Sequence, residues 1–331
     1  MATADEPPRI AGPVSQPKRP RLLPPPGAWD SHFHIFGPSD KFPYQPGRAY
    51  TPPDAPVERL IALLDHLGFS NGLVVQGNAH VYDNRVVLDA LERFPQRLRG
   101  VAITDTRVAP EMLRDWHKCG IRGLRFHLFP PRVRRGVGFD VFHVFRKIMA
   151  DLGWVAQFFC DHRLLAPSAA AFKAISRDMP VIVDHLGMVP AERGVGDENF
   201  QALLKLVGDG HAYVKVSAVY RLSAQYPDYA DARVLHDALV RANPQALMWG
   251  TDWPHPSIAA AVMPDDGHLL DLFHDWTPDE KTRRQILVDT PVCEVILVHR
   301  HCRRLTRQSI LSCSRFKASA WTTGSSPVVT I

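Results

Sequence analysis

Residues 28–35 read Ala-Trp-Asp-Ser-His-Phe-His-Ile, a short apolar and aromatic run that ends in two histidines. A run of this length and composition is typical of a β-strand. Side chains two positions apart in a strand lie on the same face, so His32 and His34 are expected to project together. The stretch therefore predicts a first strand that carries two imidazoles at its carboxyl end.

The same kind of run recurs along the chain and alternates with longer segments of helical spacing. The expected strands are Ala28–Ile35, Gly72–Gln76, Gly100–Ile103, Gly123–Leu128, Val155–Cys160, Val181–His185, Tyr213–Ser217 and Leu247–Thr251. The expected helices are Val57–Leu67, Asn84–Arg93, Pro110–Lys118, Val141–Leu152, Pro167–Arg177, Asn199–Gly208, Ala232–Ala242, Gly267–Phe273 and Pro278–Val288.

Eight strand-then-helix units over roughly 260 residues match the order and size of a (β/α)8 TIM barrel, an α/β fold of one domain. A doubly wound open sheet is the alternative. That fold would favour a glycine-rich phosphate loop after an early strand, and the sequence contains neither GxGxxG nor GxxxxGK[ST]. We therefore expect the barrel over residues 28–289.

The two ends of the chain differ from this pattern. Residues 1–27 hold 8 of the 29 prolines, which predicts a disordered or loosely draped leader. Residues 290–331 hold six of the 39 basic residues and one of the 34 acidic ones, which leaves 33 of each in residues 1–289. The net charge of +5 thus belongs to a divergent tail. The simplest hypothesis is that this tail is a non-native ending, such as a shifted reading frame would produce.

Charge, apolar runs and cysteine content exclude several classes of protein. Because residues 1–289 are neutral in sum, we expect neither nucleic acid nor an anionic membrane as a partner. No apolar run approaches the roughly 18–20 residues that span a bilayer, and the first residues lack a secretory signal. The five cysteines are odd in number and form no CxxC pair, which favours a reducing cytoplasm over a disulfide framework.

Active sites of barrels lie at the carboxyl ends of the strands. The expected first strand ends with His32 and His34, the sixth with Asp184-His185, and the eighth leads into Thr251-Asp252-Trp-Pro-His-Pro256. Each motif alone has a purely structural reading, as a strand-end turn or as a helix cap. Their placement at three strand ends of one barrel favours a site of imidazoles and a carboxylate, which can bind a metal or activate water.

These motifs resemble the amidohydrolase superfamily, in its amidohydrolase-related branch. The stretches Trp29–Pro38, Phe42–Tyr44 and Tyr50–Ala55 are most similar to those of 2-pyrone-4,6-dicarboxylate hydrolases and related lactonases. The resemblance covers about residues 28–290. It departs from the family pattern after Asp289, where relatives usually continue with Asn-Pro and an aromatic pair and this chain reads Thr290-Pro291.

The resemblance implies a role for each matching residue. Asp252 would be the general base, and His32, His34 and His185 would polarise the lactone carbonyl or hold a metal. The residues that would bind substrate carboxylates are Tyr50, Arg125, Arg221 and Arg132. A guanidinium supports such a role because it can pair with a carboxylate through two hydrogen bonds. A surface or loop salt bridge is the alternative for each arginine.

The resemblance also bears on metal content. Many members of the superfamily bind two metals through a carboxylated lysine on the fourth strand, but residues 121–128 here contain no Lys or Glu. The pyrone hydrolases work without a metal, so we expect that no cofactor is required. The alternative is one Zn²⁺ held by His32, His34, His185 and Asp252.

Together these observations predict a hydrolase that opens a small carboxylated lactone, 2-pyrone-4,6-dicarboxylate or a similar compound, in the breakdown of aromatic compounds. Three alternatives stay open: a sugar-lactone hydrolase, a zinc-dependent decarboxylase of the same superfamily, and a catalytically inactive barrel. The divergence after Asp289 is what motivates the last of them.

Overall fold

The computed structural model describes residues 6–129 and 138–292 and has the expected barrel. Eight parallel strands follow one another around a single sheet in the order of the sequence. The strands are β1 (Trp29–Phe33), β2 (Asn71–Val75), β3 (Leu98–Ala102), β4 (Ile121–Leu128), β5 (Val155–Cys160), β6 (Val181–Val183), β7 (Tyr213–Lys215) and β8 (Leu247–Met248). The fold class predicted from the sequence is confirmed.

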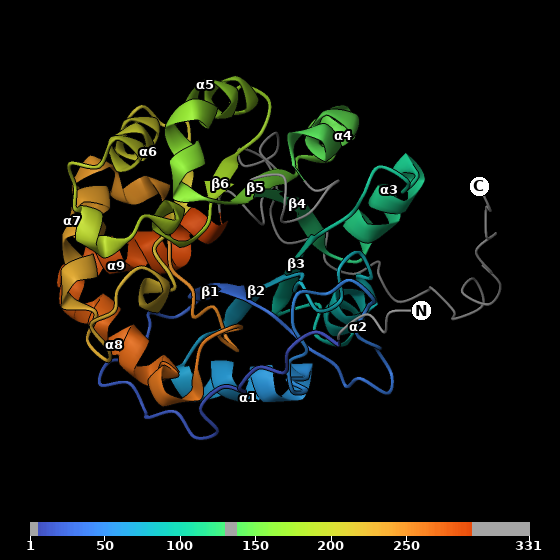
Figure 1. Cartoon of the computed structure of the whole chain (residues 1–331), viewed down its shortest axis with the longest axis horizontal. Coiled ribbons are helices and arrows are strands. Elements are labelled where there is room, and N and C mark those ends of the chain that lie inside the picture. Colours follow the sequence, from blue (N-terminus) through green and yellow to red (C-terminus); the bar gives the residue numbers. More distant parts are fainter. Residues whose placement is uncertain (1–5, 130–137, 293–331) are drawn as a thin grey trace.

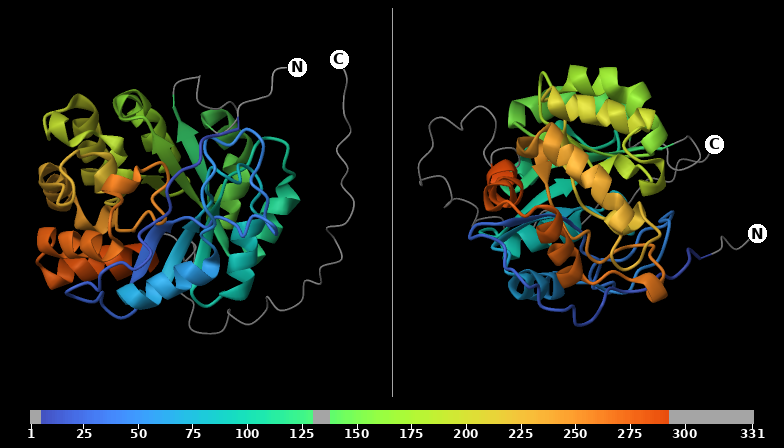
Figure 2. Two further views of the ribbon diagram at one scale, coloured as in Figure 1. Left: turned by 60° about the horizontal axis from the view of Figure 1, so that its bottom comes forward. Right: turned by 90° about the vertical axis from the view of Figure 1, so that its left-hand side faces the viewer.

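Helices form an outer layer around this sheet, as Figures 1 and 2 show. They are α1 (Val57–Leu67), α2 (Arg85–Arg93), α3 (Pro110–Lys118), α4 (Phe139–Leu152), α5 (Leu165–Ile175), α6 (Glu198–Gly208), α7 (Arg233–Ala242), α8 (Asp266–Trp276) and α9 (Glu280–Arg284). Each of the helices α1 to α8 buries apolar residues; in α1 these are Val57, Leu60, Leu63, Leu64 and Leu67. None of the helices in the described part of the chain is long and apolar enough to cross a membrane.

The inside of the barrel has an apolar layer and, nearer the carboxyl ends of the strands, a polar one. The apolar layer is a separate cluster formed by Leu73, Val75, Val101, Val155, Ile182 and Met248. Gln157 lies two positions after Val155 on β5, and Asp184 lies two positions after Ile182, just past β6. The Gln157 amide donates to the Asp184 carboxylate. Because the side-chain period of a strand is two, the same strand face supplies first the packed core and then the polar layer.

The barrel closes where β8 meets β1. The backbone N–H of Ser31 donates to Trp249 O (2.9 Å), and that of Asp252 donates to His32 O (2.8 Å). The Asp30 carboxylate accepts hydrogen bonds from the backbone N–H and the hydroxyl of Thr251. A Cβ atom on Gly250 would lie 2.5 Å from His32 N, so only glycine allows this approach. The closure places His32 beside Asp252.

Element boundaries differ from the expected ones mainly at the carboxyl ends of the strands. The sixth and eighth strands end two or three residues early, at Val183 and Met248, because the chain leaves strand geometry toward the site. The expected helix Pro278–Val288 is instead α9 followed by a π-helical turn, Gln285–Asp289. Helix α9 begins at Glu280 because the Asp279 side chain caps it by accepting from Thr282 N.

The described part of the leader, residues 6–27, has no helix. Arg9 forms an isolated β-bridge with Thr51, and the later residues run along the outside of the barrel past α8 (Figure 1). Its backbone is fixed at defined points: Lys18 N donates to Asp265 Oδ2 (2.9 Å) and Arg21 N donates to Asp271 Oδ1 (2.7 Å). The lysine ammonium also pairs with Asp271 (3.0 Å). The leader is thus draped on the barrel through specific contacts with α8.

The chain is packed against the barrel as far as the beginning of the expected tail. Thr290 is buried, and its hydroxyl donates to Gln245 O (3.1 Å). The rest of the expected tail, from residue 293 onward, lies outside the described residues.

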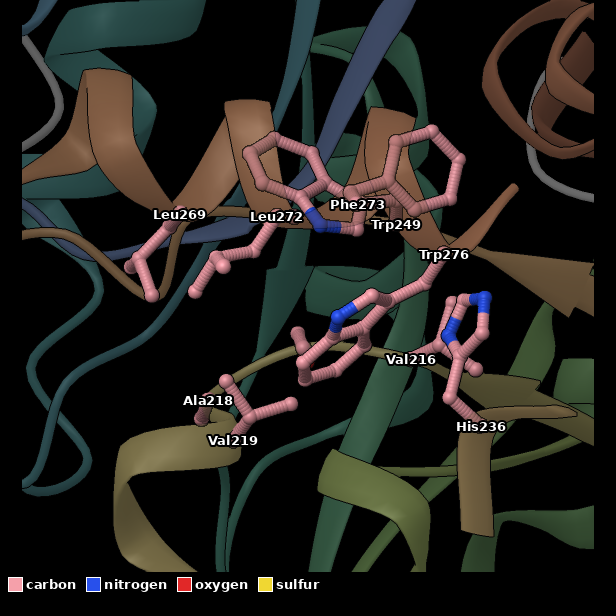
Figure 3. Close-up of a pocket in the computed structure, with 11 residues that line it drawn as sticks. Val216, Ala218, Val219, His236, Trp249, Leu269, Leu272, Phe273 and Trp276 are labelled. Atoms are coloured by element: carbon pink, nitrogen blue, oxygen red, sulfur yellow. The ribbon is translucent and has the colours of Figure 1, made fainter. Parts of the chain in front are cut away.

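A small, mostly apolar cavity lies between the end of β7, the residues after β8 and the helices α7 and α8 (Figure 3). Trp249, Phe273 and Trp276 line it together with His236, whose Nε2 lies 2.9 Å from the Thr277 hydroxyl. Asp252 does not line this cavity. The cavity is therefore part of the packing of α8 on the barrel.

Candidate active site

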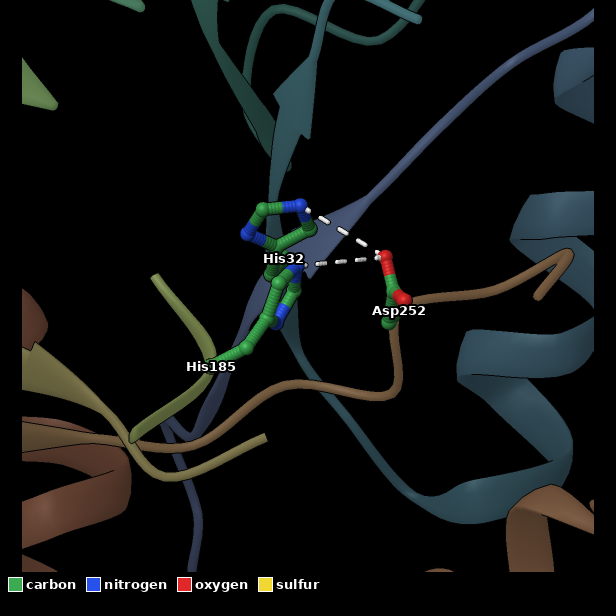
Figure 4. Close-up of side chains that lie close together, drawn as sticks. All are labelled: His32, His185 and Asp252. Atoms are coloured by element: carbon green, nitrogen blue, oxygen red, sulfur yellow. Dashed lines mark ion pairs between the residues drawn. The ribbon is translucent and has the colours of Figure 1, made fainter. Parts of the chain in front are cut away.

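Three imidazoles converge on one oxygen of Asp252. Nε2 of His34, His32 and His185 lies 3.3, 3.6 and 3.8 Å from Asp252 Oδ1. His32 and His34 come from β1 and the residue just after it, His185 follows β6, and Asp252 follows β8 (Figure 4 shows His32, His185 and Asp252). All four side chains are buried. The structure thus brings together the four residues that the sequence motifs singled out.

The other oxygen of Asp252 is held by hydrogen bonds. Oδ2 accepts from the hydroxyl of Tyr220 (2.6 Å) and from Nε of Arg221 (2.8 Å). Burial alone would raise the pKa of Asp252, but Arg221 and the histidines hold it well below the usual range. Asp252 is therefore an ionised carboxylate with Oδ2 occupied, while Oδ1 has no hydrogen-bond partner among residues 6–129 and 138–292.

The far ring nitrogens of the histidines have partners that orient the rings. His34 Nδ1 lies 2.8 Å from Val75 O, a carbonyl that can only accept, so this nitrogen carries a proton. His185 Nδ1 lies 2.9 Å from the Ser217 hydroxyl. In neutral His34, Nε2 is then a lone pair that faces the Asp252 carboxylate. Two acceptors so close need a proton, a water molecule or a cation between them.

A charged network lies directly beneath His32. Asp184 accepts from Arg125 Nε (2.9 Å) and from the Gln157 amide (2.8 Å). Lys215 Nζ donates to Gln157 Oε1 (2.8 Å). His32 Nδ1 lies 3.3 Å from Lys215 Nζ and also 3.3 Å from Asp184 Oδ1. His32 Nδ1 therefore stands between a cationic donor and an anionic acceptor.

Burial shifts the protonation of this network. It lowers the pKa of Lys215 to about 7 and that of His185 to about 4. The pKa of His32 is well below its usual value because of burial and the neighbouring Lys215. Burial alone would raise the pKa of Asp184, but Arg125 and His32 hold it well below its usual range. At neutral pH His32 and His185 are therefore neutral, while Asp184 and Asp252 are ionised.

The backbone at the site is unusual. His185 and Asp252 have φ angles of 51° and 61°, in the left-handed region that residues with a side chain seldom adopt. Such conformations cost roughly 1–3 kcal/mol each and persist where surrounding contacts fix them. Here they occur at the two residues that bring His185 Nε2 to 3.8 Å from Asp252 Oδ1.

The donor set fits a divalent metal. Ligand atoms of His32, His185 and Asp252 all lie within 4.8 Å of one another. Nε2 of His32 and Oδ1 of Asp252 are buried without a hydrogen-bond partner within the described part of the chain. If His32 Nδ1 donates to Asp184, its Nε2 is a metal ligand of the usual carboxylate–histidine kind. If Lys215 donates to Nδ1, Nε2 is instead a hydrogen-bond donor.

The predicted substrate-binding residues have specific places. Arg125 is 4% exposed, pairs with Asp184 and stacks over Phe159. Arg221 donates to Asp252 Oδ2 and to Pro256 O. Tyr50 is buried, and its ring meets that of Phe36 edge to face, with the centroids 6.2 Å apart. Phe36 in turn stacks on His34. Both arginines thus have carboxylate partners within the protein. Arg132 lies outside the described residues, and binding of substrate carboxylates by these side chains stays a prediction.

Sequence reasoning missed several residues of the site. The strand-end motifs do not point to Tyr220, although it precedes Arg221, nor to Gln157 and Lys215, which lie within expected strands. A signal was available for the last two. A polar or charged side chain two positions beyond an apolar one within a buried barrel strand is expected to face the polar layer.

Known proteins resemble this chain over most of its length. The sequence model described as amidohydrolase matches residues 29–292. A 4-sulfomuconolactone hydrolase of Hydrogenophaga intermedia is 35% identical over 285 residues, which is 86% of this chain and 93% of the relative. A 2-pyrone-4,6-dicarboxylate hydrolase of Comamonas testosteroni is 35% identical over 290 residues, 84% of this chain and 93% of the relative.

Among solved structures, the crystal structure of a protein from Agrobacterium tumefaciens superposes with a TM-score of 0.71 at 26% identity. The superposition covers 83% of this chain and 98% of that one. Sequence and fold therefore agree with the resemblance that the strand-end motifs suggested. The chain belongs to the amidohydrolase family.

Proposed function

We propose that the protein is a hydrolase of lactone ester bonds in which Asp252 is the general base. The observation that carries this proposal is the unequal use of the two Asp252 oxygens. Oδ2 is held by Tyr220 and Arg221, while Oδ1 faces three imidazoles and has no hydrogen-bond partner in the described part of the chain. A water molecule at Oδ1 would lie at the centre of a preorganised polar site.

In the proposed reaction this water attacks the lactone carbonyl carbon while Asp252 Oδ1 takes its proton. The carbonyl oxygen becomes negatively charged and is stabilised by N–H donors of the histidine cluster. The ester bond to the ring oxygen then breaks, and the leaving oxygen recovers the proton from Asp252. The new carboxylic acid releases the second proton of the water to solvent, so the products are a carboxylate, a proton and the open-chain hydroxyl or enol.

We propose a small carboxylated lactone as the substrate. Two relatives at 35% identity are named for hydrolysis of 4-sulfomuconolactone and of 2-pyrone-4,6-dicarboxylate, which are both anionic lactones. Arg125 and Arg221 bind Asp184 and Asp252, and Tyr50 contacts Phe36, which stacks on His34. These three are the described residues proposed to bind the anionic groups. Arg132 is proposed for the same role. Guanidinium groups at the site favour an anionic lactone over a neutral sugar lactone, because they pair with anionic groups through directed N–H donors.

We propose that the chain's own residues suffice for this chemistry. If a divalent metal is bound, His32, His34, His185 and Asp252 would hold it, and it would act as a Lewis acid on the carbonyl. In both cases Tyr220 and Arg221 hold the carboxylate through Oδ2, and Asp184 with Lys215 sets the proton position on His32.

Proton release at constant pH tests the proposal with three lactones. We expect rapid ring opening of 2-pyrone-4,6-dicarboxylate or 4-sulfomuconolactone and none of D-glucono-1,5-lactone above the spontaneous rate. Turnover of the sugar lactone alone would favour a sugar-lactone hydrolase. The absence of turnover on all three by folded protein would favour a catalytically inactive barrel.

A further inference from the structure

A buried chain of side chains leads from helix α8 to the catalytic carboxylate. Asp266 Oδ1 lies 3.1 Å from His255 Nε2, and His255 Nδ1 lies 3.0 Å from the hydroxyl of Tyr220. That hydroxyl is 2.6 Å from Asp252 Oδ2. His255, Asp266 and Asp252 are fully buried, and Tyr220 is 8% exposed. The four residues therefore form a row of direct contacts that is shielded from solvent.

The direction of the hydrogen bonds follows from the ionised end of the row. The Asp252 carboxylate can only accept, so the Tyr220 hydroxyl donates its proton to Oδ2. The phenol oxygen is then an acceptor for His255 Nδ1, which must carry a hydrogen. Between His255 Nε2 and Asp266 there is room for one further proton. The ionised Asp252 thus fixes the direction of the Tyr220 hydrogen bond, and Tyr220 fixes which nitrogen of His255 carries a hydrogen.

The far end of the row is firmly anchored. Asp266 is the first residue of α8, where the positive end of the helix dipole favours a carboxylate. His255 has a φ of 58°, and its ring meets that of Tyr220 edge to face, with the centroids 5.1 Å apart. Contacts on both sides therefore hold an unusual backbone conformation in place.

We propose that His255, backed by Asp266, is a positioning residue that orients Asp252 through Tyr220. With Oδ2 held in this way, Oδ1 stays aimed at the histidine cluster and is the oxygen that acts as the base. The inference rests on the proposed role of Asp252. It goes further by making a histidine that has no contact with Oδ1 necessary for full turnover.

A double-mutant cycle tests whether His255 acts through Tyr220. Turnover of 2-pyrone-4,6-dicarboxylate or 4-sulfomuconolactone, whichever is hydrolysed faster, is measured for Tyr220→Phe, His255→Gln and the double variant. We expect kcat to fall about tenfold or more in each single variant, with KM changed by less than about twofold. The double variant should be no slower than Tyr220→Phe within about twofold, because the two residues act in series.

His255→Asn is the matched variant that separates positioning from packing. The amide nitrogen of asparagine can replace Nδ1 and still donate to Tyr220, whereas that of glutamine replaces Nε2 and faces Asp266. We therefore expect His255→Asn to lose only about threefold in kcat, clearly less than His255→Gln. Circular dichroism and Tm of each variant check that the barrel is folded.

Losses that multiply in the double variant would overturn the inference, and so would equal losses in His255→Asn and His255→Gln. Asp252→Asn in the same assay distinguishes this failure from failure of the proposed function. If Asp252→Asn is inactive and the cycle is multiplicative, His255 has only a packing role. If Asp252→Asn is fully active, both the proposed function and the positioning role are wrong.

Discussion

Nζ of Lys215 lies 3.3 Å from Nδ1 of His32 inside the barrel, and both side chains are fully buried. The ammonium is also bonded to Gln157 and lies 3.8 Å from Asp184. A buried lysine is costly, and burial lowers its pKa to about 7. Its contacts offset part of this cost, since the lysine donates to Gln157 and lies beside Asp184 and His32 in the polar layer.

The lowered pKa of Lys215 predicts how stability depends on alkaline pH. Above about pH 7 the unfolded chain binds a proton at this lysine that the folded chain releases, so stability rises with pH toward the unfolded value near 10.4. From pH 7 to 9 this one group should add about 2–3 kcal/mol to the free energy of unfolding. Urea unfolding at both pH values should show a smaller rise for Lys215→Met than for the wild type. Equal rises would contradict the account.

The lowered pKa of His236 predicts a loss of stability at acid pH. Burial lowers its pKa to about 3, so between about pH 6.5 and 3 the unfolded chain binds a proton that the folded chain does not. Its contribution to stability is present above pH 6.5 and is lost as the pH falls. We expect wild-type protein to lose about 2–3 kcal/mol more than His236→Gln between pH 7 and 4.5, as measured by urea unfolding. Parallel curves would show that His236 does not titrate in this way.

Much of the site could be predicted because its residues stand at strand ends, where short-range sequence rules apply. The two-residue spacing of His32 and His34 fixes them on one strand face, and barrel topology brings that face to Asp252. The pairing of Arg221 with Asp252 could not be predicted in this way. It joins residues from different strand ends and depends on the turn at Asp252, where φ is 61°.

The last elements show a second limit of sequence reasoning. Helical spacing predicted a single helix over Pro278–Val288, but the Asp279 cap and the π-helical turn Gln285–Asp289 divide it. Side-chain capping and a widened turn leave the apolar spacing almost unchanged. The pattern therefore located the segment correctly and missed how it is divided.

Tyr50 is predicted to bind substrate and to take no part in proton transfer. Removal of its hydroxyl in Tyr50→Phe should raise KM for an anionic lactone about tenfold and change kcat by less than about threefold. Steady-state kinetics with Tyr226→Phe provides the control, since Tyr226 is 47% exposed and lies away from the histidine cluster. A fall in kcat with unchanged KM would assign Tyr50 to the chemical step.

Metal analysis tests the proposal that the chain's own residues suffice. We expect purified protein to contain substoichiometric zinc, and turnover to be unchanged after treatment with 1,10-phenanthroline and removal of the chelator. Because His32, His185 and Asp252 form a suitable ligand set, the alternative has a clear signature. One zinc per chain, whose removal abolishes turnover and whose return restores it, would contradict the metal-free reaction.

The most direct test of the central claim is kcat of Asp252→Asn on an anionic lactone that the wild type hydrolyses. Asparagine keeps the size of the side chain but cannot take a proton, so kcat should fall by about a thousandfold or more while circular dichroism is unchanged. Asp271→Asn, a buried carboxylate on α8 that binds the leader, is the control and should retain wild-type turnover. Wild-type kcat in folded Asp252→Asn would contradict the role of Asp252 as the general base.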